Sequence, residues 1–161
     1  MVDVLVPILI VLGAVVGMEG VAWFTHRYVM HGWGWRWHKS HHEPRSGVFE
    51  KNDRFAIIFA GIAVVLFAAG DAWSPLWWLA IGVTLYGVLY FLVHDGLVHR
   101  RWPFRYAPRN RYLKRLVEAH RLHHAVSGKE GCVSFGFLYA RRPEVLRERL
   151  KESRRSLRST A

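Results

Sequence analysis

The sequence predicts an all-α integral membrane protein, a helical bundle of about three to four transmembrane helices with a cytoplasmic, histidine-rich metal cap. Three observations lead to this fold. Apolar residues make up 52% of the 161 residues. Charged residues make up 22% and gather between and after the long apolar runs. All ten histidines fall in four short clusters that follow two of these runs.

Three apolar runs are expected to cross the membrane. Residues 4–24 are nearly all apolar, and a helix over them would span about 30 Å, the thickness of a hydrocarbon core. Residues 55–70 and 77–93 form two further runs. The first run lacks a positive leading segment and a small-residue cleavage site before the first histidine. We therefore expect it to be retained, not removed as a secretory signal.

The distribution of charge predicts the orientation. The net charge is +11, and lysines and arginines lie between the first and second runs and after the third. Only Asp71 is charged between the second and third runs. Because cytoplasmic loops are rich in Lys and Arg, we expect the N-terminus outside and the C-terminus and all ten histidines on the cytoplasmic side. The basic residues form no nucleic-acid-binding module, so no nucleic acid partner is expected.

Two helices are expected beyond the spans, over residues 112–124 and 145–157. The second carries Leu146, Leu150 and Leu157 on one stripe with arginines around it. This pattern favours a solvated or membrane-surface helix, and a docking patch for an acidic electron carrier is the alternative. The chain is therefore divided into a membrane domain over residues 1–140, which holds the duplicated histidine motifs, and a basic amphipathic tail over residues 141–161.

The histidines form a repeat. The first set is His26-x4-His31 followed by His38-x2-His41-His42, and the second is His94-x4-His99 followed by His120-x2-His123-His124. The two pairs are 68 residues apart and the two triplets 82 residues apart. One insertion of 14 residues in the second set accounts for this difference. Because neutral imidazole is a preferred ligand of transition metals, the repeat predicts that all ten histidines are metal ligands.

The spacings suggest how the rings are arranged. Residues three and four apart share a helix face, so His38 can pair with His41 and His42. These two neighbours diverge by about 100° and can reach different ions. The five-residue spacing leaves two rings about 140° apart on an ideal helix. It requires either a π-helical distortion or a second ring just past a helix end. Gly32 favours the second option for His31, and both options stay open for His99.

The donor set constrains the metal. Calcium prefers carboxylates, and structural zinc sites often use cysteine, of which Cys132 is the only example. A haem would use only two histidines as axial ligands and would leave the other eight unexplained. The His-Glu-x-x-His motif of zinc proteases is absent. Ten imidazoles predict a two-metal site that favours iron and binds O2. Zinc and copper stay open, with zinc as a substitute in purified protein.

Two further groups of residues are expected around the metals. Metal-bound histidines usually donate their second N–H to an oxygen acceptor. The candidate acceptors are Glu19, Glu43, Asp95 and Glu118. Glu19 is the most suggestive of them, because an ionisable residue within a span is costly and usually functional. Aromatic side chains expected to line a substrate channel are Phe24, Trp78, Tyr86, Tyr90 and Phe91.

These motifs resemble those of the membrane-bound, histidine-rich di-iron oxygenases, the fatty acid hydroxylase superfamily. The sequence between the motifs resembles the bacterial β-carotene 3-hydroxylase branch. The resemblance extends to about Tyr139, and no histidine of the pattern is missing. The matching stretches are His26-Arg-Tyr-Val-Met-His-Gly-Trp-Gly-Trp, His38-Lys-Ser-His-His-Glu-Pro-Arg, His94-Asp-Gly-Leu-Val-His-Arg-Arg-Trp-Pro-Phe-Arg-Tyr and Gly128-Lys-Glu-Gly-Cys-Val-Ser-Phe-Gly-Phe-Leu-Tyr.

The resemblance implies a monooxygenase of the bacterial inner membrane with two non-haem iron ions. It would hydroxylate carbon 3 of β-ionone rings, converting β-carotene through β-cryptoxanthin to zeaxanthin. It would consume O2 and take electrons from reduced ferredoxin or a similar donor. No catalytic residue beyond the metal centre is implied. Two alternatives stay open: a hydroxylase or desaturase of another membrane lipid, such as a fatty acyl chain or a sterol, and a non-catalytic metal-binding membrane protein.

Overall fold

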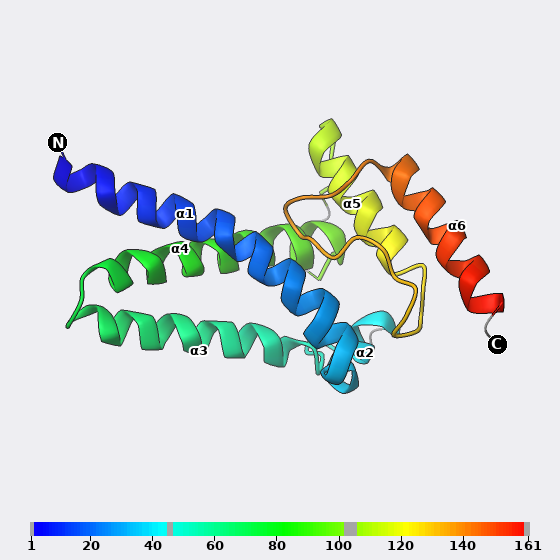
Figure 1. Cartoon of the computed structure of the whole chain (residues 1–161), viewed down its shortest axis with the longest axis horizontal. Helices are drawn as coiled ribbons and strands as arrows, with labels where there is room; N and C mark the ends of the chain where they lie inside the picture. The colour runs from blue at the N-terminus through cyan, green and yellow to red at the C-terminus, as the bar shows by residue number, and fades with distance from the viewer. Residues whose placement is uncertain (1, 45–46, 102–105, 160–161) are drawn as a thin grey trace.

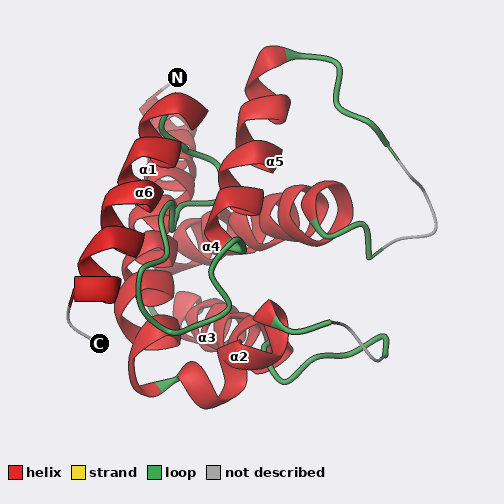
Figure 2. Ribbon diagram, turned by 90° about the vertical axis from the view of Figure 1, so that its right-hand side faces the viewer, coloured by secondary structure: helices red, strands yellow, loops and turns green. Residues whose placement is uncertain are grey.

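The computed structural model describes residues 2–44, 47–101 and 106–159, and every regular element within them is helical (Figure 2). Two π-helical segments, η1 and η2, continue the long helices α1 and α4. The elements are α1 (Val2–Phe24), η1 (Thr25–Trp33), α2 (Trp35–His42), α3 (Asp53–Gly70), α4 (Pro75–Tyr90), η2 (Phe91–Val98), α5 (Arg111–His123) and α6 (Pro143–Ser159).

Three helices are long and apolar enough to cross a membrane, namely Val4–Trp33, Asp53–Gly70 and Pro75–Val98. Their outward side chains are apolar although exposed, as Val16 and Val65 show at 75% and 67% exposure. Continuous apolar surface of this kind requires lipid around it. The protein is therefore an integral membrane protein, and the predicted all-α bundle is confirmed with three spans. The first and third spans extend beyond their apolar runs because η1 and η2 continue them.

The central helix of the bundle is α4, on which both α1 and α3 pack (Figure 1). The helix begins at Pro75, whose fixed φ suits the first helical position. Gly82 lies against α1: a Cβ built there would overlap the Cβ of Ala14 and lie 2.8 Å from the Val11 carbonyl oxygen. Small residues allow such close approach of two membrane helices.

The remaining elements form a cap at one end of the spans, where α2, α5, α6 and the connection between α5 and α6 gather (Figures 1 and 2). Asn110 caps α5, since its side-chain oxygen accepts a hydrogen bond of 2.8 Å from the Leu113 N–H. Leu116 of α5 packs in one buried cluster with Leu146 and Leu150 of α6. Both predicted helices beyond the spans are confirmed. The apolar stripe of α6 covers α5, and its arginines are exposed.

An ion network joins the second and third spans at their capped end. The Arg101 guanidinium donates to both carboxylate oxygens of Asp53, at 2.8 Å each, and to Asp95 at 3.3 Å. Bidentate arginine–carboxylate pairs hold a defined geometry. Arg101 therefore joins the beginning of α3 to η2, directly beside the histidines of the third span.

The contact between α1 and α4 yields a stability prediction. Gly82→Val should lower the free energy of unfolding by about 1–3 kcal/mol, because the new side chain overpacks the helix interface. Thermal unfolding of the detergent-solubilised protein measures the change. Gly61→Val on α3 is the control, since a Cβ there meets nothing within 4 Å. Equal melting temperatures for the two variants would contradict this packing.

Candidate metal centre

All ten histidines lie together at the capped end of the spans. Seven of them are buried, and His42, His99 and His124 are half-buried. The rings form one cluster, although His26 and His124, its first and last members, are 98 residues apart in the sequence. The histidines come from η1 (His26, His31), α2 (His38, His41, His42), η2 and the residue after it (His94, His99), and α5 and the residue after it (His120, His123, His124).

The π-helical segments explain the five-residue spacing of the histidine pairs. In a π-helix a backbone N–H donates to the carbonyl five residues earlier, and the His99 N–H donates in this way to His94 at 2.9 Å. One turn of π-helix brings residues five apart onto a common face. The ring centroids of His26 and His31 are consequently 5.3 Å apart, and those of His94 and His99 are 4.5 Å apart.

The position of His31 corrects one expectation from the sequence. Gly32 favoured a ring just past a helix end, but His31 lies within η1. The backbone departs from helical geometry only at the next residue, Gly32, which has φ −103° and ψ −124°. The Gly34 N–H then bonds the Val29 carbonyl at 2.8 Å, again five residues back. The glycine therefore ends the π segment and turns the chain into α2.

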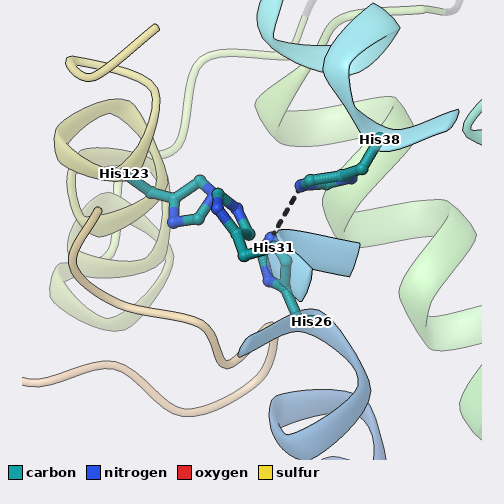
Figure 3. Close-up of side chains that lie close together, drawn as sticks. All are labelled: His26, His31, His38 and His123. Atoms are coloured by element: carbon teal, nitrogen blue, oxygen red, sulfur yellow. Dashed lines mark hydrogen bonds between the residues drawn. The ribbon is translucent and has the colours of Figure 1, made fainter. Parts of the chain in front are cut away.

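Eight histidines form two groups of four, in each of which one nitrogen per ring lies within 4.8 Å of the others. Figure 3 shows the side chains of the first group pointing toward one another from η1, α2 and α5. Each group takes three histidines from one repeat and the middle histidine of the triplet from the other repeat. The first quartet is His26, His31, His38 and His123, and the second quartet is His41, His94, His99 and His120.

The last two histidines lie between the quartets. The Nε2 atom of His42 is 3.3 Å from that of His38, and the Nε2 atom of His124 is 2.9 Å from that of His120. The rings of His42 and His124 stack at a centroid distance of 4.4 Å. His41 and His42 thus reach different groups, as their divergence on a helix suggests.

Hydrogen bonds establish which ring nitrogens carry protons. In the first quartet, His31 Nδ1 lies 2.9 Å from the Lys129 carbonyl oxygen and His123 Nδ1 lies 3.0 Å from that of Val133. A carbonyl only accepts, so Nδ1 donates in both rings and a neutral ring keeps a lone pair on Nε2. These two Nε2 atoms are nevertheless 3.2 Å apart. Two facing lone pairs repel, and a cation between them removes the repulsion. The donor set therefore fits a metal ion.

The same pattern extends through the cluster. The Nε2 atoms of His26 and His38 are 3.2 Å apart (dashed line in Figure 3), and those of His41 and His94 are 3.1 Å apart. The Nδ1 atoms of these four rings and of His42 all lie beside oxygen atoms, which leaves Nε2 of each ring for a metal. These oxygens are Phe135 O for His26 (2.9 Å), Asn52 Oδ1 for His38 (2.7 Å), Glu50 Oε2 for His41 (2.9 Å), Asp95 Oδ1 for His94 (2.8 Å) and Val126 O for His42 (3.1 Å).

Burial keeps the histidines of the cap neutral. Burial, together with smaller effects of neighbouring histidines, lowers the pKa of His38 to about 3, of His42 to about 4 and of His124 to about 2. The pKa values of His41, His120 and His123 also lie well below the usual value, chiefly because of burial. At neutral pH these rings are uncharged, which is the form that binds metals.

Of the four carboxylates expected to accept hydrogen bonds from histidines, one does so. Asp95 accepts from His94, as expected. In a correction to the sequence-based expectation, Glu43 pairs with Lys39 at 3.2 Å on the surface of α2. Glu118 likewise pairs with Arg147 of α6 at 2.8 Å, because both acids lie on outward helix faces.

Glu19 also departs from the expectation. Its carboxylate accepts a hydrogen bond of 2.7 Å from the Tyr86 hydroxyl and further bonds from the backbone amides of residues 137–139. It lies on α1 more than a turn before His26, and its side chain reaches the connection between α5 and α6 instead of a histidine ring.

Sequence reasoning missed Glu50 and Asn52, which lie between α2 and α3. Glu50 accepts from His41, and the buried Asn52 accepts from His38. The two residues are 9 and 14 positions from their histidines, so no helical spacing relates them. The turn of the chain before α3 brings them back, and Ser40 Oγ accepts the Asn52 N–H at 3.3 Å.

Cys132 lies close to His42 and His123, with its sulfur within 4.8 Å of one nitrogen of each. Burial raises the pKa of its thiol to about 12. The thiol contacts the carbonyl oxygens of Val126 and Gly128 at 3.9 and 3.7 Å. The Cys132 thiol is therefore protonated at neutral pH.

A mainly apolar cavity of about 580 Å³ lies among α1, α3 and α4, and two of its lining residues, Tyr90 and Phe137, contact histidines. The Tyr90 ring in its wall stacks on His94 at a centroid distance of 4.5 Å. Tyr86, Tyr90 and Phe91 line it, as expected for a substrate channel. Phe24 and Trp78 do not belong to this lining; they are 56% and 38% exposed and face the outside of the bundle.

Comparison with known proteins supports these observations. The family model described as fatty acid hydroxylase matches residues 11–140. The beta-carotene hydroxylase of Pseudescherichia vulneris is 66% identical over 150 residues, which cover 92% of this chain and 85% of that protein. The proteins of the same name from Pantoea ananas and Paracoccus sp. (strain N81106 / MBIC 01143) are 60% and 56% identical, covering 89% and 90% of this chain and 83% and 91% of their own lengths. No solved structure matches the chain significantly. The chain belongs to the fatty acid hydroxylase family.

Proposed function

We propose that this protein is a carotenoid hydroxylase with a non-haem di-iron centre. It inserts oxygen at carbon 3 of β-ionone rings and converts β-carotene through β-cryptoxanthin to zeaxanthin. The observation that carries the proposal is the apolar cavity within the spans, whose wall residues Tyr90 and Phe137 contact histidines of the two quartets. The bacterial relatives named beta-carotene hydroxylase, which share 55–66% of their residues with this chain, support the choice of substrate.

All ten histidines are proposed as ligands, with one iron ion in each quartet and with His42 and His124 between them. The paired ions supply the activation of O2 that is needed to cleave an unactivated C–H bond. The protein holds the imidazoles through their Nδ1 partners, of which Asp95, Glu50 and Asn52 are side chains. Zinc would fit the same nitrogens in purified protein.

The cavity binds and orients the substrate. Its volume is typical of sites that enclose a small ligand, so one ring end would lie beside His94 while the rest of the molecule lies in lipid. Tyr90 and Phe137 form the wall between the cavity and the histidines. This wall excludes water and places a ring carbon near the metal centre.

The charge pattern supports an orientation in the bacterial inner membrane with the N-terminus outside and the histidines and C-terminus in the cytoplasm. Electrons would reach the cap from the aqueous side, from reduced ferredoxin or a similar donor. The basic tail over residues 141–161, whose helix α6 packs on α5, would face this side.

A second candidate is a hydroxylase or desaturase of another membrane lipid. The matching family model is described as fatty acid hydroxylase, and a mainly apolar cavity gives few hydrogen bonds by which to distinguish a ring from an acyl chain. Product analysis separates the two candidates.

Co-expression in bacteria that accumulate β-carotene tests the function directly. The pigment should shift to β-cryptoxanthin and zeaxanthin, identified by chromatography and mass spectrometry. His123→Ala should abolish the shift because it removes a ring of the first quartet. Unchanged β-carotene beside folded, iron-loaded protein would refute the substrate assignment, and a hydroxylated or desaturated fatty acid would favour the second candidate.

The ligand assignment predicts the iron content of single variants. Purified protein should hold two ions per chain, and His31→Ala or His99→Ala should each remove one, because each breaks a different quartet. Metal analysis per folded chain measures this content. Glu43→Gln, which alters only a surface ion pair, should keep both ions. Two retained ions in His31→Ala would remove that residue from the ligand set.

The cavity predicts an effect on turnover without loss of iron. Ala60→Phe places a ring at the lipid-facing side of the cavity on α3, so hydroxylation should fall about tenfold or more through misplaced substrate. Ala69→Phe, on an exposed part of the same helix, is the matched control. Wild-type activity in Ala60→Phe would place the substrate elsewhere.

A further inference from the structure

Glu19 holds an unusual position, because it is a carboxylate within the first span. Its Oε1 atom accepts the backbone N–H groups of Phe137, Leu138 and Tyr139 at 2.9, 3.1 and 3.0 Å. Its Oε2 atom accepts the Leu138 N–H at 3.0 Å and the Tyr86 hydroxyl at 2.7 Å. Successive N–H groups that converge in this way form a binding site for a negative charge. The contacts compensate the carboxylate for its place in a membrane helix.

The segment that Glu19 holds also orients two histidines. Residues 133–139 belong to no helix, so their position depends on side-chain contacts. The Val133 carbonyl accepts the N–H of His123, and the Phe135 carbonyl accepts that of His26. Both histidines belong to the first quartet. The Phe135 carbonyl is only two residues before the first amide that Glu19 binds.

Gly136 shows that the approach of the carboxylate to the chain is close. A Cβ atom built at this residue would lie 2.7 Å from Glu19 Oε1 and 2.5 Å from the Tyr139 carbonyl oxygen. Any other side chain at this position would displace the carboxylate. The contact thus depends on both an acid in α1 and a glycine in the segment.

The same segment carries a ring of the cavity wall. Phe137 stacks on His26 with a centroid distance of 5.1 Å and an interplanar angle of 9°. It also meets the edge of Tyr90 at 4.8 Å. A shift of this segment would therefore move an imidazole of the first quartet and the cavity wall together.

We propose that Glu19 is a positioning residue for the first metal quartet, acting through the segment of residues 133–139. The carboxylate fixes the carbonyls that hold His26 and His123 with Nε2 toward the metal. The second quartet takes its orienting oxygens from Glu50 and Asp95. It meets this segment through ring contacts of Phe137 with His94 and His120. The inference rests on the two-ion centre proposed above, but not on the identity of the substrate.

Anaerobic titration of the full-length protein with Fe²⁺ tests the inference without carotenoid. Wild-type protein should bind two ions. Glu19→Gln should bind one ion as before and the other about tenfold or more weakly, the size expected when an outer partner of a ligand is lost. The amide removes the negative charge and turns an NH₂ group toward N–H donors. Glu50→Gln is the matched counterpart and should weaken the other ion.

Two backgrounds identify the affected quartet. In His99→Ala, which retains the first-quartet ion, Glu19→Gln should weaken the remaining site. In His31→Ala, which retains the second-quartet ion, Glu19→Gln should have a much smaller effect, because the orienting oxygens of that quartet lie outside the segment. Equal weakening in both backgrounds would indicate a general loss of structure and overturn the inference.

Gly136→Ala tests the same contact from the other side if Glu19→Gln does not fold. It should weaken the first-quartet ion selectively, whereas Gly128→Ala, where a Cβ meets nothing within 4 Å, should not. Wild-type Fe²⁺ affinities in Gly136→Ala and in folded Glu19→Gln would refute the role of Glu19. A wild-type protein that binds no Fe²⁺ would overturn the two-ion centre as well.

Discussion

The mutual repulsion of imidazole lone pairs is the constraint on which the rest of the structure depends. Seven of the ten histidines place Nδ1 beside a carbonyl, amide or carboxylate oxygen. Their Nε2 atoms consequently face one another at close to 3 Å inside a buried cluster. Such a cluster is stable only around positive charge, and burial disfavours protonation of the rings as its source. We therefore expect metal binding and folding of the cap to be coupled.

The exchange of one histidine between the repeats ties the two halves of the chain together. His123 completes a quartet that otherwise belongs to the first repeat, and His41 completes the other. Neither half can form its metal site alone. The three spans bring both halves to the same end of the bundle (Figure 1). The apolar cavity lies beside this end, with Tyr90 and Phe137 between it and the histidines. A lipid-soluble substrate and an aqueous electron donor can approach this place from different sides.

The histidines and spans were predictable from the sequence because both are periodic. The apolar runs are as long as a membrane is thick, and the two histidine sets repeat with fixed offsets. The partners of the histidines carry no such period. Asn52 and Glu50 reach the quartets through a turn, and the carbonyls of Val133 and Phe135 belong to a segment without helix. Glu19 was recognisable as an unusual acid within a span, but its amide partners lie more than a hundred residues away.

X-ray absorption at the iron edge tests the central claim most directly. The account predicts light-atom ligands with the outer-shell scattering of imidazole rings and no sulfur, because each quartet consists of histidines alone. A sulfur ligand at the iron, or a spectrum without imidazole scattering, would contradict a centre held by histidines.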